Sequence, residues 1–447
     1  MVKKIFFIIL CGVFVIQAEA QSTYTLEQVI DSAKAHNIAI RKGQRDIHSA
    51  KEQRKEAFTK FFPTVSATGA WFNANKSMAK TDVDLSQYIT PELATSLSQI
   101  LPPETLAALS QPMSLSMMKN GVIASVSAIQ PIFAGGQIIN GNKLAKIGEE
   151  VSRLQLQLTE DEVEKTAEEY FWQIVTLEEK QRTLEAVTAM LNDIHKDVTL
   201  AVQAGLVLRN DLLQVELRKN EVESQQVKLQ NALSLVRMLL AQYCGLHDTE
   251  FTLRYQPEAP SPLAFKRDHQ QALLTIPEYQ LLDKQVEATT LQKKMAIGEN
   301  LPSVAVGAGY NYHNLLDNDQ TFGMLFATVS VPISNWWGGS HHIKRTKLAQ
   351  QQAIEDRDNN IQLLSIRMQK AWNDVEEAYQ QLSIADRSIV QAEENLRIQR
   401  NCYQSGTITM SDLLEAQMLH QQALDHRTDA FADYQNKLLA YQHAVGM

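Results

Sequence analysis

The sequence predicts a membrane β-barrel joined to a long α-helical barrel, built by a chain that carries two tandem copies of one structural unit. Three observations predict this fold class. Motifs recur at a nearly constant offset, apolar heptads persist over about 65 residues, and strand-length segments alternate apolar with small or polar residues. The 447 residues are 44% hydrophobic and 21% charged, which suits an ordered protein with a large core.

The first twenty residues have the pattern of a secretory signal peptide. Lys3 and Lys4 precede an apolar run at residues 5–16, and Ala18 and Ala20 supply an Ala-x-Ala cleavage site. We therefore expect the mature protein to begin at Gln21. Removing two lysines and one glutamate from the 42 basic and 51 acidic side chains leaves 40 − 50 = −10. This acidic balance argues against a nucleic-acid partner.

Internal duplication is the strongest signal in the chain. Residues 203–213 and 404–414 share the pattern Gln-x-Gly-x5-Asp-Leu-Leu at an offset of 404 − 203 = 201. Pro131 and Pro332 have the same offset, since 332 − 131 = 201. Each copy is therefore expected to run helix, strand, strand, very long helix, turn and helix.

These matches define the expected domain limits. The first repeat spans residues 21–244 and includes a long irregular insertion at residues 75–120. A proline-containing linker at residues 245–265, near mid-height of the helical part, leads to the second repeat at residues 266–447. The turns at the far ends of the long helices are expected at residues 203–211 and 404–412.

Four segments have the alternation expected of membrane strands. From Val304 to Tyr312 every second residue is apolar, and those between are small or polar. Residues 65–71, 121–129 and 322–331 are less regular. No mature segment has the ~18 consecutive apolar residues of a spanning helix, so a membrane crossing would have to use strands.

A small soluble sheet packed on the helices explains this alternation equally well. Four strands cannot close a barrel, and open strand edges are not tolerated in lipid. Either the strands are soluble, or several chains share one barrel. Three chains would supply 3 × 4 = 12 strands, about the number needed for an open lumen.

Two heptad runs predict helices too long for a globular domain. Every seventh residue from Val163 to Val198 is apolar, and the same holds from Ile361 to Tyr403. At 1.5 Å per residue, a helix of about 65 residues spans roughly 100 Å. The helices that follow each turn are about half as long, which predicts two tiers of helices.

The duplicated plan, the signal peptide, the Pro-Ile-Phe-Ala-Gly-Gly segment at residues 131–136 and the Gly-x5-Asp-Leu-Leu turns together resemble the TolC family of outer membrane efflux channels. The resemblance implies a homotrimer with a twelve-stranded barrel in the outer membrane of a Gram-negative bacterium and a large periplasmic α-barrel. It also implies docking to a periplasmic adaptor and an inner membrane pump, as the passive exit duct of a tripartite efflux or type I secretion system.

The strand-to-helix junctions are the first candidate sites. We expect Pro131 and Pro332, which lack an N–H, to end strand pairing. The glycines that follow, Gly135-Gly136 and Gly338-Gly339, are expected to permit the sharp change from strand to helix. The second junction departs from the family pattern, because residues 334–337 read Ser-Asn-Trp-Trp.

Aromatic residues at the expected membrane boundary are a second candidate set, since Trp and Tyr favour that interface. They are Trp71, Tyr310, Tyr312, Trp336 and Trp337. The alternative for the last two is packing beneath the barrel.

The far turns are the expected docking region. Gly205 and Gly406 are predicted to end the long helices in left-handed geometry. The exposed residues that follow are expected to meet the adaptor: Leu206, Val207, Arg209, Thr407 and Ile408. Arg209 could instead pair with a neighbouring acid as a latch.

Aspartates begin the helices after both turns in this interpretation. Asp211 with Gln214, and Asp412 with Glu415, have capping-box spacing. The resemblance further implies that Asp412 and Glu415 line a constricted periplasmic entrance, where threefold symmetry would repeat them as a carboxylate ring that attracts cations.

No catalytic or metal-binding motif is expected. His341 and His342 are adjacent in a predicted helix and would point about 100° apart, and no nucleophile elbow, phosphate loop or Cys/His ligand spacing is present. We therefore expect no enzyme, cofactor or metal. The competing class is a periplasmic coiled-coil scaffold or adaptor without a pore, which leaves the four duplicated strands unexplained.

Overall fold

The computed structural model describes residues 22–84, 89–98, 100–102, 104–105, 113–117, 119–315 and 319–447. The expected signal peptide lies outside these residues. The chain divides into two compact units, and the long helices pass from one unit to the other. Unit 1 comprises the described part of Met1–Ser49, Glu150–Gln285 and Ile354–Met447, and unit 2 comprises Ala50–Glu149 and Val286–Ala353.

The described helices follow the predicted order. The two longest, α5 and α9, have 67 and 70 residues, and the two that follow the far turns, α6 and α10, have 36 and 35. Their bounds, with those of the shorter helices, are α1 Leu26–His36, α2 Ile38–Thr59, α3 Pro91–Ser98, α5 Gln137–Gln203, α6 Arg209–Cys244, α7 His269–Leu273, α8 Pro277–Gly298, α9 Asn335–Gln404 and α10 Met410–Ala444. None of these helices is long and apolar enough in composition to cross a membrane.

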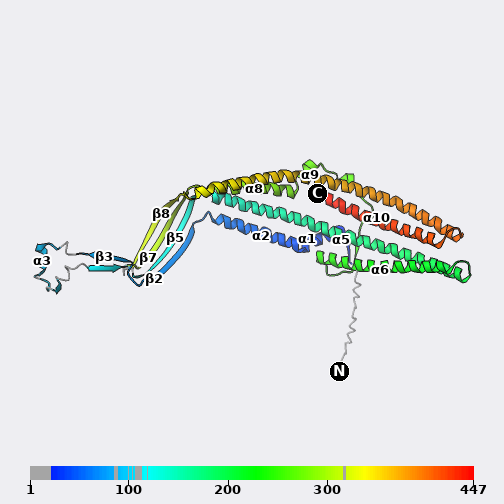
Figure 1. The fold of residues 1–447 in the computed structure, drawn as a ribbon, viewed down its shortest axis with the longest axis horizontal. Coiled ribbons are helices and arrows are strands. Elements are labelled where there is room, and N and C mark those ends of the chain that lie inside the picture. Colours follow the sequence, from blue (N-terminus) through cyan, green and yellow to red (C-terminus); the bar gives the residue numbers. More distant parts are fainter. Residues whose placement is uncertain are drawn as a thin grey trace, which may run out of the picture. The chain divides into compact units, whose positions relative to one another are not determined.

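Heptad residues supply the core of unit 1. Along α5, Val163, Leu184 and Leu191 are buried, and along α9 so are Met368 and Val375. In Figure 1, α6 lies along α5 and α10 along α9. The predicted packing of the heptad residues is therefore confirmed, because an apolar stripe with a seven-residue period keeps facing a neighbouring helix.

Residues of the linker between the repeats pack into this core. A short strand, β1 (Ser22–Thr25), pairs in parallel with β6 (Phe251–Arg254). Fully buried Tyr434 donates to the carbonyl of Pro260, and the buried hydroxyl of Tyr441 accepts from the backbone N–H of Arg267 at 3.0 Å. These contacts attach the linker to α10.

Unit 2 contains a four-stranded antiparallel sheet in the order β2-β5-β7-β8 (Figure 1). Its strands are β2 Thr64–Asn73, β5 Asn120–Ala134, β7 Ser303–His313 and β8 Gln320–Ser330. The two strands from the first repeat thus pair directly with the two from the second, through β5 and β7. All three neighbouring pairs are antiparallel. Each repeat supplies two strands that run in opposite directions, as consecutive antiparallel strands do.

The insertion in the first repeat is not irregular throughout. Within its described residues, β3 (Ala79–Val83) pairs antiparallel with β4 (Met113–Met117), and α3 lies between them in the chain. The sequence of the insertion does not predict this two-stranded ribbon, since a two-stranded pair needs few apolar positions and so leaves little periodicity.

Candidate functional site

The two faces of the sheet differ in chemistry. The register places Val65, Trp71, Val126, Tyr310 and Leu325 on one face, and all five are exposed. Such a broad apolar surface exceeds what a soluble sheet normally presents to water. This face fits a hydrocarbon environment.

The opposite face carries a ladder of hydroxyl groups. Ser66 and Ser127 approach at 3.2 Å between their Oγ atoms, and Thr68 and Ser125 at 2.7 Å. The polar character is strongest on β2 and β5. On β8 this face instead carries Phe322, Met324 and Phe326, so the two edges of the sheet differ.

Both edge strands of the sheet lack a partner on their outer side within the described residues. β2 pairs with β5 alone, and β8 pairs with β7 alone. Strands of ten and eleven residues therefore present rows of N–H and C=O groups. In a lipid environment these groups need a further strand, because no water is present to satisfy them.

The expectation for Pro131 is wrong, whereas Pro332 does follow the end of its strand. β5 continues through Pro131 to Ala134, and its register with β7 shifts between Pro131 and Phe133. A bulge removes the need for an N–H at the proline, so pairing resumes beyond it. Pro332 comes after β8, which ends at Ser330.

The first glycine pair has the predicted backbone. Gly135 and Gly136 have φ of 60° and 74°, the left-handed region. Gly135 also lies against the backbone of Gly298, where a β carbon would overlap the carbonyl. Sequence analysis missed Gly298, because its requirement for glycine arises from a residue far away in the chain.

The second glycine pair does not form the predicted turn. Gly338 and Gly339 lie inside the first turns of α9, which begins at Asn335. Gly339 is still constrained, since a β carbon there would overlap the side chain of Asn300. The two junctions therefore use different geometry despite the repeated motif.

The boundary aromatics differ in how they are held. Trp336 is half exposed and donates from Nε1 to the carbonyl of Asn300 at 3.1 Å, whereas Trp337 is 78% exposed. Tyr312 donates to Oδ1 of Asp319 at 3.0 Å. The indole N–H of Trp336 is therefore satisfied within the chain, whereas the Trp337 ring is exposed.

Both far turns have the predicted helix-ending glycine. Gly205 and Gly406 have φ of 73° and 72°. Leu206 N–H donates to the carbonyl of Ala201 at 2.9 Å, and Thr407 N–H to that of Cys402 at 3.0 Å. These bonds complete the usual glycine-terminated helix end in both repeats.

The helix starts after the turns differ from the expected capping boxes. α6 begins at Arg209 after Leu208, which supplies no side-chain cap, and Asp211 is its third residue. α10 begins after Thr409, whose side chain and that of Asp412 form a reciprocal capping box. Threonine takes the N-cap because its extended backbone directs the hydroxyl to the N–H three residues on.

The capping box lowers the pKa of the Asp412 carboxyl. Asp412 accepts from Thr409 Oγ1 at 2.6 Å and from Thr409 N–H at 2.9 Å, and these hydrogen bonds hold the pKa of its carboxyl below the usual value. The carboxylate therefore stays charged at neutral pH. Glu415 lies outside the box and is exposed.

The two turns together form an open cavity of about 610 Å³ lined by residues of all four adjoining helix ends. Burial and then the charge of Asp211 raise the pKa of Tyr403 on its wall. At its rim, Leu206 is 78% and Leu208 is 73% exposed. Arg209 is exposed and has no ion pair within the described residues.

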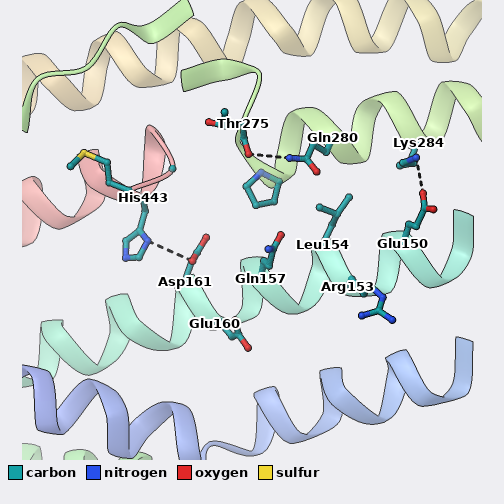
Figure 2. Close-up of a pocket in the computed structure, with 13 residues that line it drawn as sticks. Glu150, Arg153, Leu154, Gln157, Glu160, Asp161, Thr275, Gln280, Lys284 and His443 are labelled. Atoms are coloured by element: carbon teal, nitrogen blue, oxygen red, sulfur yellow. Dashed lines mark hydrogen bonds and ion pairs between the residues drawn. The ribbon is translucent and has the colours of Figure 1, made fainter. Parts of the chain in front are cut away.

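A second cavity, of about 640 Å³, lies in unit 1 between α5, α8 and the C-terminal residues (Figure 2). Lys284 pairs with Glu150 at 2.7 Å, and His443 faces Asp161 at 3.8 Å. Burial raises the pKa of Asp161, and His443 opposes that rise. No group of three His, Cys, Asp or Glu side chains in the described chain could hold a metal ion.

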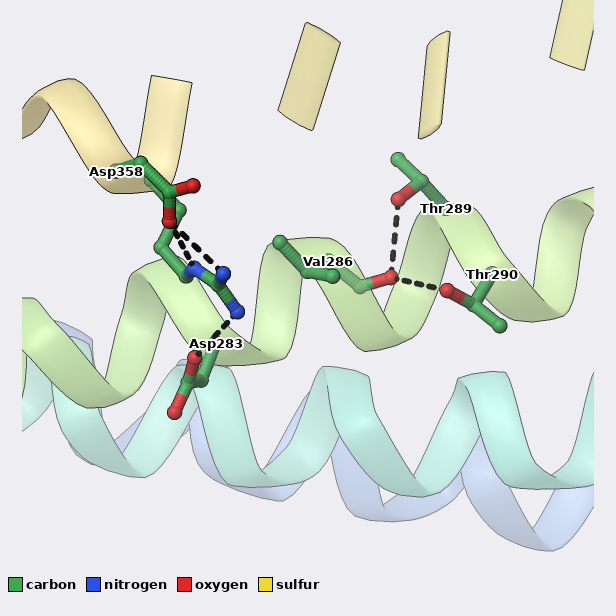
Figure 3. A network of polar contacts seen from close by, with 6 residues as sticks. Asp283, Val286, Thr289, Thr290 and Asp358 are labelled. Carbon is green, nitrogen blue, oxygen red and sulfur yellow. Dashed lines mark hydrogen bonds and ion pairs between the residues drawn. The ribbon is translucent and has the colours of Figure 1, made fainter. Parts of the chain in front are cut away.

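The polar contacts along α8 join it to α9 or connect successive turns of α8 itself (Figure 3). Arg357 of α9 lies 3.6 Å from Asp283 of α8 and 2.8 Å from its own neighbour Asp358. The carbonyl of Val286 accepts from the hydroxyls of the two threonines that follow one turn later.

Comparisons with known proteins agree with this geometry. Residues 269–447 match the family model described as outer membrane efflux protein. The CmeC outer membrane channel of Campylobacter jejuni is similar in structure, with a TM-score of 0.75 at 14% identity over 94% of this chain and 85% of that one. The outer membrane protein VceC of Vibrio cholerae has a TM-score of 0.74 at 14% identity, over 94% and 96%.

CusC, a protein described as forming a transmembrane channel, has a TM-score of 0.77 at 14% identity over 94% of this chain and 91% of that one. At such identity these likenesses establish the fold. Comparison with curated protein sequences gives no match.

Proposed function

We propose that the protein is the passive exit duct of a tripartite efflux or type I secretion system. Residues 269–447 match the model of the outer membrane efflux protein family, and the chain has the fold of solved outer membrane channels. The observation that carries the proposal is the four-stranded sheet, which has an exposed apolar face and two edges that no described strand pairs with. An efflux channel is a conduit, so no reaction is assigned to the chain.

Closure of the barrel requires identical partners. The outer edge of β8 in one chain would pair with the outer edge of β2 in the next, and three chains would give 3 × 4 = 12 strands. The face with Trp71 and Leu325 would then contact lipid in the outer membrane of a Gram-negative bacterium. The hydroxyl ladder would line the lumen, where water satisfies it.

The helices would extend into the periplasm as an α-barrel that ends at the two far turns. Asp412 is ionised, and Glu415 lies one turn further along α10. Repeated three times, they would form a negatively charged entrance favouring cations. Exposed Leu206 and Leu208 would meet the helical tips of a periplasmic adaptor bound to an inner membrane pump.

The test is the state of the protein in cells and in planar bilayers. We expect heat-modifiable trimers in the outer membrane fraction, and purified trimers that form conducting pores. A coiled-coil scaffold or adaptor would instead be extracted without detergent and would not conduct. Water-soluble monomers with no conductance would overturn the proposal.

A further inference from the structure

We propose that a cationic cleft between α2 and α5, just before β2, binds the phosphate group of an anionic phospholipid. The inference rests on the proposed function, which places the start of β2 at the membrane surface. The cleft has a volume of about 630 Å³. Its cationic lining consists of Lys51, Arg54, Lys55, Lys143 and Lys146.

Two contacts hold the walls of the cleft together. Asn142 Nδ2 on α5 donates to the carbonyl of Ala57 on α2 at 2.7 Å. Arg54 pairs with Glu149 at 3.0 Å, and the Glu149 side chain is almost fully buried. Both contacts join the two helices directly, so the cleft exists before any ligand arrives.

The cleft keeps positive charge beyond its internal pairs. Among the described residues that line it, Glu149 is the single carboxylate against five cations, and Lys55 pairs with Glu52 at 2.8 Å outside the cleft. Lys51 and Lys143 are exposed and have no ion pair in the described chain. Because the whole protein carries a net charge of −9, this excess is a local feature.

Apolar side chains lie on the strand side of these cations on both helices. Phe58 is 54% exposed, lines the cleft, and contacts Phe61 and Phe62 with ring centroids 5.7 and 5.5 Å apart. It follows Lys51 by seven residues, a rise of about 10 Å. On α5, exposed Ile139 comes one turn before Lys143.

Apolar side chains nearer the strands and cations further from them match the acyl chain and the head group of a phospholipid at a membrane surface. Aromatic and aliphatic side chains would meet the upper acyl chain, and the lysines about 10 Å away would meet the phosphodiester. A free phosphate ion could use only the cationic half. The exposed ring of Phe58 therefore favours a phospholipid over inorganic phosphate.

Native mass spectrometry of trimers in a neutral detergent tests the proposal with phosphatidylglycerol as the probe. We expect wild-type trimers to retain it in preference to phosphatidylcholine. The Lys51→Gln/Lys143→Gln trimer should bind it roughly 25-fold more weakly, since each lysine near an anionic surface contributes about fivefold. The matched control Lys196→Gln/Lys228→Gln removes two exposed lysines of unit 1 and should bind as wild type.

Three outcomes would overturn the proposal. They are equal retention of the two lipids by wild type, undiminished binding by the cleft variant, and displacement of phosphatidylglycerol by inorganic phosphate alone. The comparison of lipids on wild type holds even if the cleft variant fails to assemble. Trimers that conduct without preferring phosphatidylglycerol would refute this inference only, whereas an absence of trimers would refute the proposed function.

Discussion

Gly135 and Gly298 meet backbone to backbone: a β carbon on Gly135 would lie 2.8 Å from the Cα of Gly298. The contact joins the end of β5 to the end of α8 at the strand-to-helix junction. Neither residue can carry a side chain without moving the other.

Gly298→Ala should therefore destabilise the protein by about 1–3 kcal/mol, the usual effect of overpacking. The measurement is the temperature at which detergent-solubilised protein unfolds. Gly338→Ala is the matched control, because its β carbon would meet nothing within 4 Å inside α9 and alanine favours a helix. Equal unfolding temperatures for the two variants would contradict the close approach.

Arg218 organises a buried polar layer between α6 and α10. Its Nη2 donates to Gln421 Oε1 at 2.8 Å and its Nε to Gln417 Oε1 at 3.2 Å, and both glutamines are buried. Arg218→Leu leaves these amides without their donor, so we expect a loss of about 1–3 kcal/mol.

Exposed Arg209 on the same helix provides the control for Arg218. Arg209→Leu should change stability by no more than about 0.5 kcal/mol. Unfolding midpoints in detergent compare the two variants. A similar midpoint for both would show that the buried layer does not stabilise the packing of α6 on α10.

Glu168 should make stability depend on pH. Burial raises its pKa from 4.5 to about 7, against a hydrogen bond from Trp172 Nε1 at 2.8 Å. Because the folded state keeps this proton longer than the unfolded state, stability falls as pH rises from about 4.5 to about 7 and is level above. A pKa shift of this size corresponds to a change of about 3 kcal/mol in the free energy of unfolding.

Glu168→Gln keeps an oxygen that accepts the hydrogen bond from Trp172 and removes the carboxyl group that titrates. We expect this variant to be more stable than wild type at pH 8, with the difference vanishing near pH 4. Thermal unfolding midpoints across that range provide the measurement. Parallel pH profiles for the two proteins would exclude Glu168 as the source.

Glu415 should contribute to ion selectivity at the proposed entrance. Glu415→Gln is expected to lower cation over anion selectivity at least roughly twofold in planar bilayers, because a threefold ring of charge is lost. Glu223→Gln, an exposed acid further along α6, serves as the control. Unchanged selectivity in the Glu415 variant would place that residue away from the lumen.

Leu206→Asp tests the docking surface. A charge on a side chain that is 78% exposed should leave the trimer intact but abolish export in cells, since it would be desolvated against an adaptor. Export is measured as resistance to, or secretion of, the cargo of the cognate pump. Full export with Leu206→Asp would remove this turn from the docking surface.

The order of elements was predictable from the sequence because it depends on local periodicity. Heptads along α5 and α9, alternation along β7 and the left-handed glycines at 205 and 406 each concern neighbours within a few residues. The duplication then extended these patterns across both halves of the chain. The family resemblance rested on the same repeated motifs.

Contacts between distant residues were decided only by the tertiary structure. Pro131 remains within a strand because β7 accommodates a bulge, and Gly298 must be glycine because Gly135 lies against it. The layer around Arg218 likewise needs α6 and α10 placed side by side. Such constraints join residues up to 421 − 218 = 203 positions apart, so no local pattern could record them.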